Sequence, residues 1–275
     1  MSQLAVVPGK PSAAEHLQSG AKILTLELDI LGEPACLDLK VTDGPARLAD
    51  IAPLSRTIST KLALATLNRL SSRGQRVPCR KGCSACCNYL VPLSVPEAFR
   101  IAEELSAMPA IESRTLVQSS LDTSRIILDR SPEYFEMREP AEANNGIRSE
   151  QLGNWYAGLG IACPFLSDGL CLTYEQRPIA CREHVVTNSA VSCDAASKDE
   201  PNVVRMPVSV LECLGQLTAE LEQSDVEAIM LPLALPWAQE NVERSRRTWP
   251  AVMVVERFVQ ILQATAAPCS PVPQP

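Results

Sequence analysis

Hydrophobic and polar residues alternate along two short stretches near the start of the chain. Residues 23–31 and 37–41 both follow this partial alternation, and Gly32-Glu33-Pro34 lies between them. A period of two is typical of strands with one buried face. We therefore predict two strands joined by a turn, preceded by a flexible tail over residues 1–20.

Helical spacing follows over most of the remaining chain. Apolar residues recur every three or four positions between Ile51 and Leu62, which predicts a helix from an N-cap at Asp50 to about Ser72. A polar, turn-rich stretch at 131–148 is expected to form an exposed loop. Further helices are expected at about 96–106, 112–130, 149–158, 207–223, 236–246 and 250–265.

Together these patterns predict a mainly α fold with a small N-terminal β element, in which helices surround a loop-borne cysteine site. The chain has 275 residues, of which 46% are hydrophobic, so it can form a core without disulfides. We expect a single globular domain over residues 21–266 that includes a cysteine-cluster region at about 77–195. A proline-rich tail is expected at 267–275.

Charge and composition narrow the range of partners. The net charge is −7, the pI is about 5.1 and only 4% of residues are aromatic, so no basic or base-stacking surface for nucleic acid is expected. The longest apolar stretch, 229–238, contains two prolines and is too short to cross a membrane, and no signal peptide is visible. We expect a cytoplasmic protein; a protein partner is compatible with the sequence, which identifies none.

Eleven cysteines dominate the candidate chemistry, and eight of them fall into two groups. Reduced thiols are usual in the cytoplasm, and an odd total leaves at least one unpaired, so a metal is favoured over disulfides. The isolated Cys36, Cys213 and Cys269 are interpreted as small buried hydrophobic residues. The predicted metal ligands are Cys79, Cys83, Cys86 and Cys87 in the first group, and Cys163, Cys171, Cys181 and Cys193 in the second.

Several chemistries fit these thiols. A [4Fe–4S] cluster often takes three closely spaced cysteines and a distant one, and this spacing fits it better than the paired spacing of a zinc finger, although zinc remains the alternative. The adjacent Cys86 and Cys87 could form a thiol–disulfide relay. Radical S-adenosylmethionine enzymes share the C-x3-C-x2-C spacing. However, Ala85 stands where they usually have an aromatic residue, and the strand–helix repeats of their barrel are missing.

Residues around the second group are candidates for supporting the centre. We predict that Arg177, Arg182 and His184 contribute to cofactor binding, the arginines by hydrogen bonds to cluster sulfurs and the histidine as a ligand or a donor to one. An ordinary ion pair of the arginines with Glu175 or Glu183 is an equally simple interpretation. No catalytic residue can be identified.

With both groups in view, the chain resembles the YkgJ-like cysteine-cluster family, a zinc- or iron-chelating CxxCxxCC-type domain. The resemblance covers about residues 77–185. The matching residues are Cys79, Cys83, Cys86 and Cys87, then Cys163-Pro164-Phe165-Leu166, Cys171, Tyr174-Glu175, Arg177-Pro178 and Cys181-Arg182.

The resemblance implies a bound zinc or iron centre, often assigned as iron–sulfur. Flagellin lysine methylases look similar in their cysteine motifs, so an enzyme that uses the cluster as a scaffold or electron conduit is the alternative. No methyl-donor pocket and no glycine-rich nucleotide fingerprint is recognisable in the sequence. The leading hypothesis is therefore an intracellular metal-binding protein with a redox or structural role.

Overall fold

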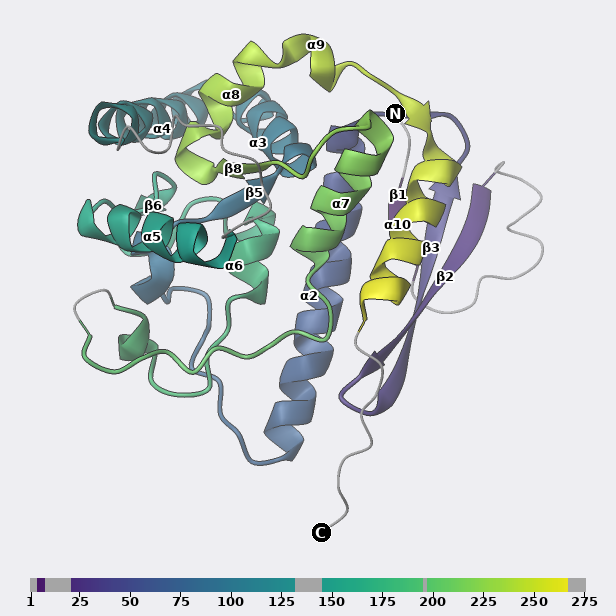
Figure 1. The fold of residues 1–275 in the computed structure, drawn as a ribbon, viewed down its shortest axis with the longest axis horizontal. Coiled ribbons are helices and arrows are strands. Elements are labelled where there is room, and N and C mark those ends of the chain that lie inside the picture. Colours follow the sequence, from purple (N-terminus) through teal and green to yellow (C-terminus); the bar gives the residue numbers. More distant parts are fainter. Residues whose placement is uncertain (1–3, 8–20, 132–144, 195–196, 267–275) are drawn as a thin grey trace.

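The computed structural model describes residues 4–7, 21–131, 145–194 and 197–266 (Figure 1). Helices dominate these residues and small β elements accompany them, which confirms the predicted fold class. Most of the predicted loop at 131–148 lies outside the described residues. So do the predicted tails, apart from residues 4–7.

An antiparallel hairpin forms the N-terminal β element. Strand β2 (Ala21–Ile30) pairs with β3 (Glu33–Thr42), and Ile30 faces Glu33 across the turn. Leu31 and Gly32 both have positive φ, at 53° and 94°, as a two-residue type I′ hairpin turn requires. The predicted pair of strands is thereby confirmed.

A third strand corrects the predicted tail over residues 1–20. Strand β1 (Leu4–Val7) pairs antiparallel with the other edge of β3, which gives the sheet order β1-β3-β2. The run Leu-Ala-Val-Val contains β-branched residues that favour strands, and β3 offers it a free edge with unpaired backbone groups.

The sheet packs against the C-terminal helix to form one hydrophobic core (Figure 1). Helix α10 (Ala251–Thr265) buries the apolar face that its sequence predicts, including Val255 and Phe258. Helix α7 (Val210–Glu222) and one side of α2 (Leu48–Ser72) complete this core.

The N-cap of helix α2 lies three residues before the predicted one. Arg47 is the N-cap, and Asp50, at the third helical position, accepts a hydrogen bond from the Arg47 backbone N–H at 2.8 Å. Asp50 therefore stabilises the first turn from inside the helix, as the acidic member of a capping box does. The predicted end at Ser72 is confirmed.

A second core lies on the other side of α2, between α3 (Val95–Ala107), α4 (Ala110–Arg130) and α8 (Ala234–Glu240). The helix predicted at 236–246 is interrupted at Asn241 and continues as α9 (Val242–Ser245). The other long helix is α5 (Asn145–Gly158). Strand β4 (Pro45–Ala46) pairs with β9 (Trp249–Pro250), and β5 (Pro92–Ser94) pairs with β8 (Ala228–Met230).

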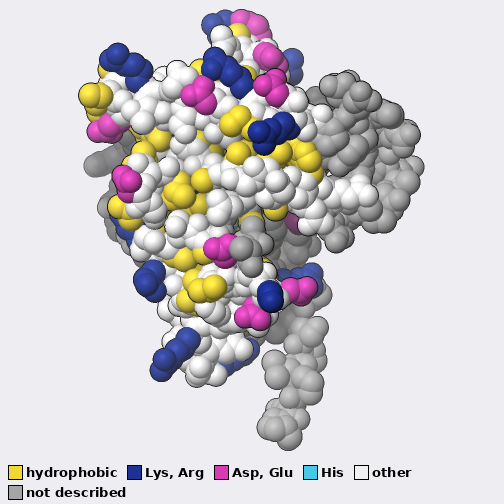
Figure 2. Space-filling view, turned by 90° about the vertical axis from the view of Figure 1, so that its left-hand side faces the viewer, with side chains coloured by type: hydrophobic (Ala, Val, Ile, Leu, Met, Phe, Trp, Pro, Cys, Tyr) yellow, Lys and Arg dark blue, Asp and Glu magenta, His cyan; other side chains and the backbone are white. Residues whose placement is uncertain are grey.

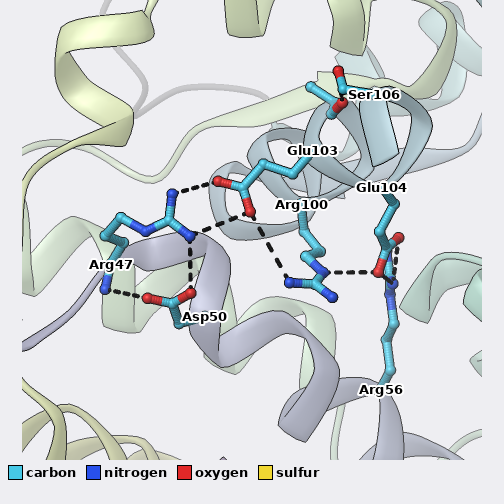
Figure 3. Close-up of polar contacts among 8 residues, drawn as sticks. Arg47, Asp50, Arg56, Arg100, Glu103, Glu104 and Ser106 are labelled. Carbon is cyan, nitrogen blue, oxygen red and sulfur yellow. Dashed lines mark hydrogen bonds and ion pairs between the residues drawn. The ribbon is translucent and has the colours of Figure 1, made fainter. Parts of the chain in front are cut away.

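A network of charged side chains fixes α3 against the start of α2 (Figure 3). Arg47 bridges Asp50 and Glu103, and Arg100 Nε donates to Glu104 at 2.8 Å. Further along α2, Arg56 Nη1 also donates to Glu104, at 2.8 and 2.9 Å to its two oxygens. This network fixes α3 against the first turns of α2.

Charges of both signs are distributed over the surface. On the face shown in Figure 2, hydrophobic side chains lie in scattered groups, with basic and acidic side chains between and around them. Within the described ranges, no helix combines the length and the apolar character that crossing a bilayer requires.

Candidate metal centre

The first cysteine group lies on a loop that follows α2. Arg80 to Cys83 form a tight turn, in which the Cys83 N–H donates to the Arg80 carbonyl at 3.0 Å. Gly82 has a φ of 88°, a conformation that glycine adopts without steric cost. The chain then forms a short 3₁₀ helix, η1 (Ala85–Asn88), that carries Cys86 and Cys87.

The second group is carried by several small elements. Strands β6 (Leu166–Ser167) and β7 (Leu170–Cys171) form a hairpin whose turn, Asp168-Gly169, has positive φ at both residues. Helix α6 (Ile179–Glu183), with Pro178 as its N-cap, carries Cys181. A 3₁₀ turn, η4 (Ala190–Cys193), ends at Cys193. Cys163 precedes the hairpin in irregular chain, so the prediction of loop-borne ligands is correct for some of these cysteines only.

The backbone joins the two groups directly. The Cys163 N–H donates to the Cys87 carbonyl at 2.7 Å, and η1 also contacts η4. Helices α3, α4 and α5 lie between the two segments in the sequence. Residues far apart along the chain are therefore held next to each other by contacts that include a backbone hydrogen bond.

Seven of the eight predicted ligands line one cavity of about 190 Å³. Cys193 is buried beside this cavity, and its sulfur lies 3.9 Å from Nε2 of His184, which does line it. All three residues predicted to support the cofactor, Arg177, Arg182 and His184, also lie in the wall. The seven cysteines are Cys79, Cys83, Cys86, Cys87, Cys163, Cys171 and Cys181.

Cys86 and Cys87 both face this cavity. Two adjacent side chains could not do so on a regular α-helix. The short 3₁₀ turn provides a different backbone, and an interaction with Cys87, followed by burial, raises the pKa of Cys86. The two sulfurs are thus close neighbours on one side of the chain.

Burial raises the pKa of several other thiols in the cavity. The pKa of Cys163 rises to about 11, and those of Cys79 and Cys181 are raised as well, with burial as the largest cause in each case. Neighbouring cysteines add to each shift, because thiolates repel one another. Without a cation, these thiols hold their protons at neutral pH.

Among the residues that the structure describes, the cavity wall contains three arginines, Arg80, Arg177 and Arg182, and no aspartate or glutamate. The Arg177 guanidinium lies 4.0 Å from the centre of the Tyr174 ring, a cation–π contact that holds it in place. A wall with this charge would offset the negative charge that several thiolates bring to a metal.

Arg182 makes hydrogen bonds that the sequence did not suggest. Its guanidinium donates to the backbone carbonyls of Glu175 and Arg177 and, at 2.6 Å, to the Thr60 hydroxyl on α2. The proposed ion pairs with Glu175 and Glu183 are wrong for this residue, because its hydrogen bonds go to these three oxygens, while Glu175 pairs with Lys81 and Glu183 accepts from Ser209 and Val210. Burial lowers the pKa of Arg182 to about 10, so it stays charged at neutral pH.

His184 is placed at the edge of the thiol cavity. Its ring contacts Tyr89 edge to face at 5.8 Å, and burial lowers its pKa. A neutral imidazole is the form that binds metals, and this one lies between Cys193 and the cavity.

Two carboxylates near the site, the buried Glu97 and the half-buried Glu183, were not predicted to position its helices. Glu97, at the start of α3, is 0% exposed and accepts hydrogen bonds from Ser94 and, at 2.8 Å, from the Ile179 N–H at the start of α6. Glu183 accepts from the Val210 N–H and the Ser209 hydroxyl, at the start of α7. The Ser94-x-x-Glu97 capping-box pattern was a readable signal for the first of them.

The thiols surround the cavity without meeting at one point. In the ranges that the structure describes, no three Cys, His, Asp or Glu side chains are grouped closely enough to hold a single ion. One water molecule needs about 10–15 Å³ of cavity volume, so a cavity of about 190 Å³ has room for a group of several atoms. The donor set of soft thiols suits zinc, iron or an iron–sulfur cluster.

Comparison with known proteins agrees with this donor set. Residues 78–202 match the family model CxxCxxCC, described as a "putative zinc- or iron-chelating domain". The match confirms the resemblance seen in the sequence, and it includes Cys193. No curated protein and no solved structure matches the chain significantly.

Proposed function

We propose that the CxxCxxCC domain of this chain, at residues 78–202, binds a [4Fe–4S] cluster between its two cysteine segments. The domain is of a metal-chelating family, and the nature of its metal group is the question. The observation that supports a shared centre is that seven cysteines from both segments line one cavity.

The size of the cavity favours a cluster over a single zinc ion. Tetrahedral zinc holds four sulfurs at about 2.3 Å from one ion. The walls of this cavity would have to close considerably to bring four thiols that near, because no three of the described ligands are grouped in that way. An iron–sulfur cluster places several iron and sulfide atoms between its thiolates and so spans a wider space.

The chain's own residues would hold and tune such a centre. Once bound, the cluster would supply one-electron chemistry or a rigid crosslink between the segments. Arg177 and Arg182 would stabilise its negative charge, and Phe165 and Val185 in the wall would limit the access of water. One cluster needs four cysteines, and seven line the cavity, so the remaining thiols could replace a ligating thiolate on the cluster.

Metal analysis after anaerobic purification tests the proposal. We expect iron and acid-labile sulfide in about equal amounts, near four of each per chain, and brown protein with broad absorption near 400 nm. Colourless protein containing one zinc would support the alternative. Protein with reduced thiols but neither metal would refute both.

An enzymatic role is a second candidate, favoured by one observation. The cavity extends past the thiols to α2, where Ala63, Leu64 and Leu67 form an apolar wall, and Leu64 is 54% exposed. An apolar side chain or small molecule could therefore approach the centre. Imidazole can serve as a test ligand, and its binding to the cluster would change the EPR spectrum of the cluster. A spectrum insensitive to added ligands would support a closed, structural or electron-transfer centre.

A further inference from the structure

A second pocket lies on the opposite side of the wall formed by Thr60 and Arg182. Its volume is about 370 Å³, and it is lined by α2, by the end of α3 and by the loop that precedes α6. Thr60 and Arg182 line both this pocket and the thiol cavity. The residues that matter for its chemistry are Arg56, Lys61, Glu104, Glu175, Gln176 and Arg182.

Arg56 has half of its guanidinium without a partner. The residue is 5% exposed, and Nη1 alone binds both oxygens of Glu104. Nε and Nη2 are buried and have no hydrogen-bond partner. These two nitrogens form one edge of the planar group, and their N–H bonds point the same way, which is the arrangement that grips a carboxylate or phosphate with two parallel hydrogen bonds.

The carboxylates near Arg56 are not available to fill this edge. Glu104 is held by Arg56 Nη1 and by Arg100, and Glu175 extends to Lys81 at 3.1 Å. Burial raises the pKa of Glu97, and the nearby Arg56 charge offsets only part of this rise. Both oxygens of Glu97 already accept hydrogen bonds from Ser94 and Ile179.

The pocket therefore has more positive than negative charge to offer a ligand. Lys61 lies in its wall and forms no ion pair among the described residues, and Arg182 adds a third cation. A buried guanidinium with unpaired donors is costly, which an anion in the pocket would relieve.

We propose that this pocket binds a small oxyanion, the carboxylate or phosphate group of a small molecule. Arg56 would bind it through Nε and Nη2, and Lys61 would neutralise its charge. Because both nitrogens are covered by protein atoms, the Arg56 side chain must turn this edge toward the pocket that it lines. The bound anion would lie across the Arg182–Thr60 hydrogen bond from the thiol cavity. The inference goes beyond the proposed cluster and does not depend on the identity of the metal.

Calorimetric titration of the metal-loaded 275-residue chain tests the proposal. Inorganic phosphate and acetate would be titrated separately, against sodium chloride at the same ionic strength. We expect saturable binding of at least one of them, weakened about tenfold or more by Arg56→Gln and by Lys61→Gln. Arg76→Gln is the matched control, because Arg76 is exposed in the loop after α2 and the substitution removes the same charge. The affinity of the Arg76→Gln variant for the anion is expected to equal that of the wild type.

The two arms also identify the kind of anion. Tighter binding of phosphate points to phosphorylated ligands, and tighter binding of acetate points to carboxylates. Dissociation constants weaker than about 10 mM for both would overturn the proposal. So would equal losses in Lys61→Gln and Arg76→Gln, since they would indicate a general effect of charge. If Arg56→Gln fails to fold, Lys61→Gln decides alone, because Lys61 is partly exposed. Metal content, measured in every variant, separates this result from the test of the cluster.

Discussion

Replacing Glu97 with alanine would remove a carboxylate that joins the start of α3 to the start of α6. Its Oε2 accepts from the Ser94 N–H at 3.2 Å and from the Ser94 hydroxyl at 3.0 Å, and its Oε1 accepts from the Ile179 N–H at 2.8 Å. Ile179 is the first residue of α6, the helix that carries Cys181. The same side chain thus caps α3 and positions a predicted ligand.

The expected loss of stability follows from the donors left behind. Ser94 and Ile179 are almost completely buried, so Glu97→Ala leaves two backbone N–H groups without partners or water. Each such group costs about 1–3 kcal/mol. Removing the carboxyl also relieves the cost of burying it, which is the main cause of its raised pKa. We therefore expect a loss of about 3 kcal/mol in the free energy of unfolding.

Glu97→Gln refines the test because it keeps the shape of the side chain. The amide oxygen can still accept from Ile179, but the amide NH₂ would then face the Ser94 N–H, so one hydrogen bond is lost at a cost of about 1 kcal/mol. Urea denaturation of each variant gives these differences, with and without metal, because bound metal is linked to folding.

A matched control and a second measurement make this prediction refutable. Glu112→Ala, on the exposed first turn of α4, is expected to change stability by less than about 0.5 kcal/mol. Glu97→Ala should also weaken metal retention against a chelator, since α6 loses its anchor. A loss below about 1 kcal/mol, or equal losses for alanine and glutamine, would contradict the role assigned to these hydrogen bonds.

Three further predictions concern the cysteine segments. Cys181→Ser should reduce the metal content of the purified protein by more than half. Cys36→Ser should leave it unchanged, because Cys36 lies on β3 and is exposed, which corrects its predicted burial; equal metal contents would contradict the assignment of ligands. Metal affinity should rise with pH, by up to about tenfold per pH unit for each thiol that must lose its proton. Burial raises the pKa of Cys163 to about 11, and below that pKa the metal must displace a proton. A metal affinity that stays constant between pH 6 and 8 in chelator competition would be inconsistent with this. Gly82→Ala should destabilise the metal-bound protein by about 1–2 kcal/mol in thermal or urea unfolding, since its φ of 88° is strained for alanine, while Gly153→Ala within α5 should be neutral or stabilising.

The elements that the sequence predicts well are those set by local spacing. The hairpin of β2 and β3 follows from alternation around Gly32, and the buried face of α10 from apolar residues at helical intervals. The β6–β7 hairpin could have been predicted too, because Asp168-Gly169 is a strong type I′ turn signal. The strand β1 was missed because a four-residue apolar run becomes a strand only when a partner edge is available.

The site could be predicted in its residues but not in its arrangement. The spacing of the cysteines identifies candidate ligands, yet their meeting in one cavity depends on contacts between distant segments, such as the hydrogen bond from Cys163 to Cys87. Charged partners were predicted for Arg182 because a sequence shows which side chains are present but not where backbone carbonyls lie. Its actual acceptors are mostly backbone carbonyls, whose positions are set by the fold.

The separation of the two cysteine segments has a consequence for synthesis on the ribosome. Cys87 leaves the ribosome before α3, α4 and α5, and Cys181 only after them. At about 5–20 residues per second, the first segment waits roughly 5–20 s for the second. During that time its four thiols, at Cys79 to Cys87, are exposed to oxidants and to the wrong metals. Delivery of the correct metal group is therefore expected to follow translation, once both segments have left the ribosome and can contact each other.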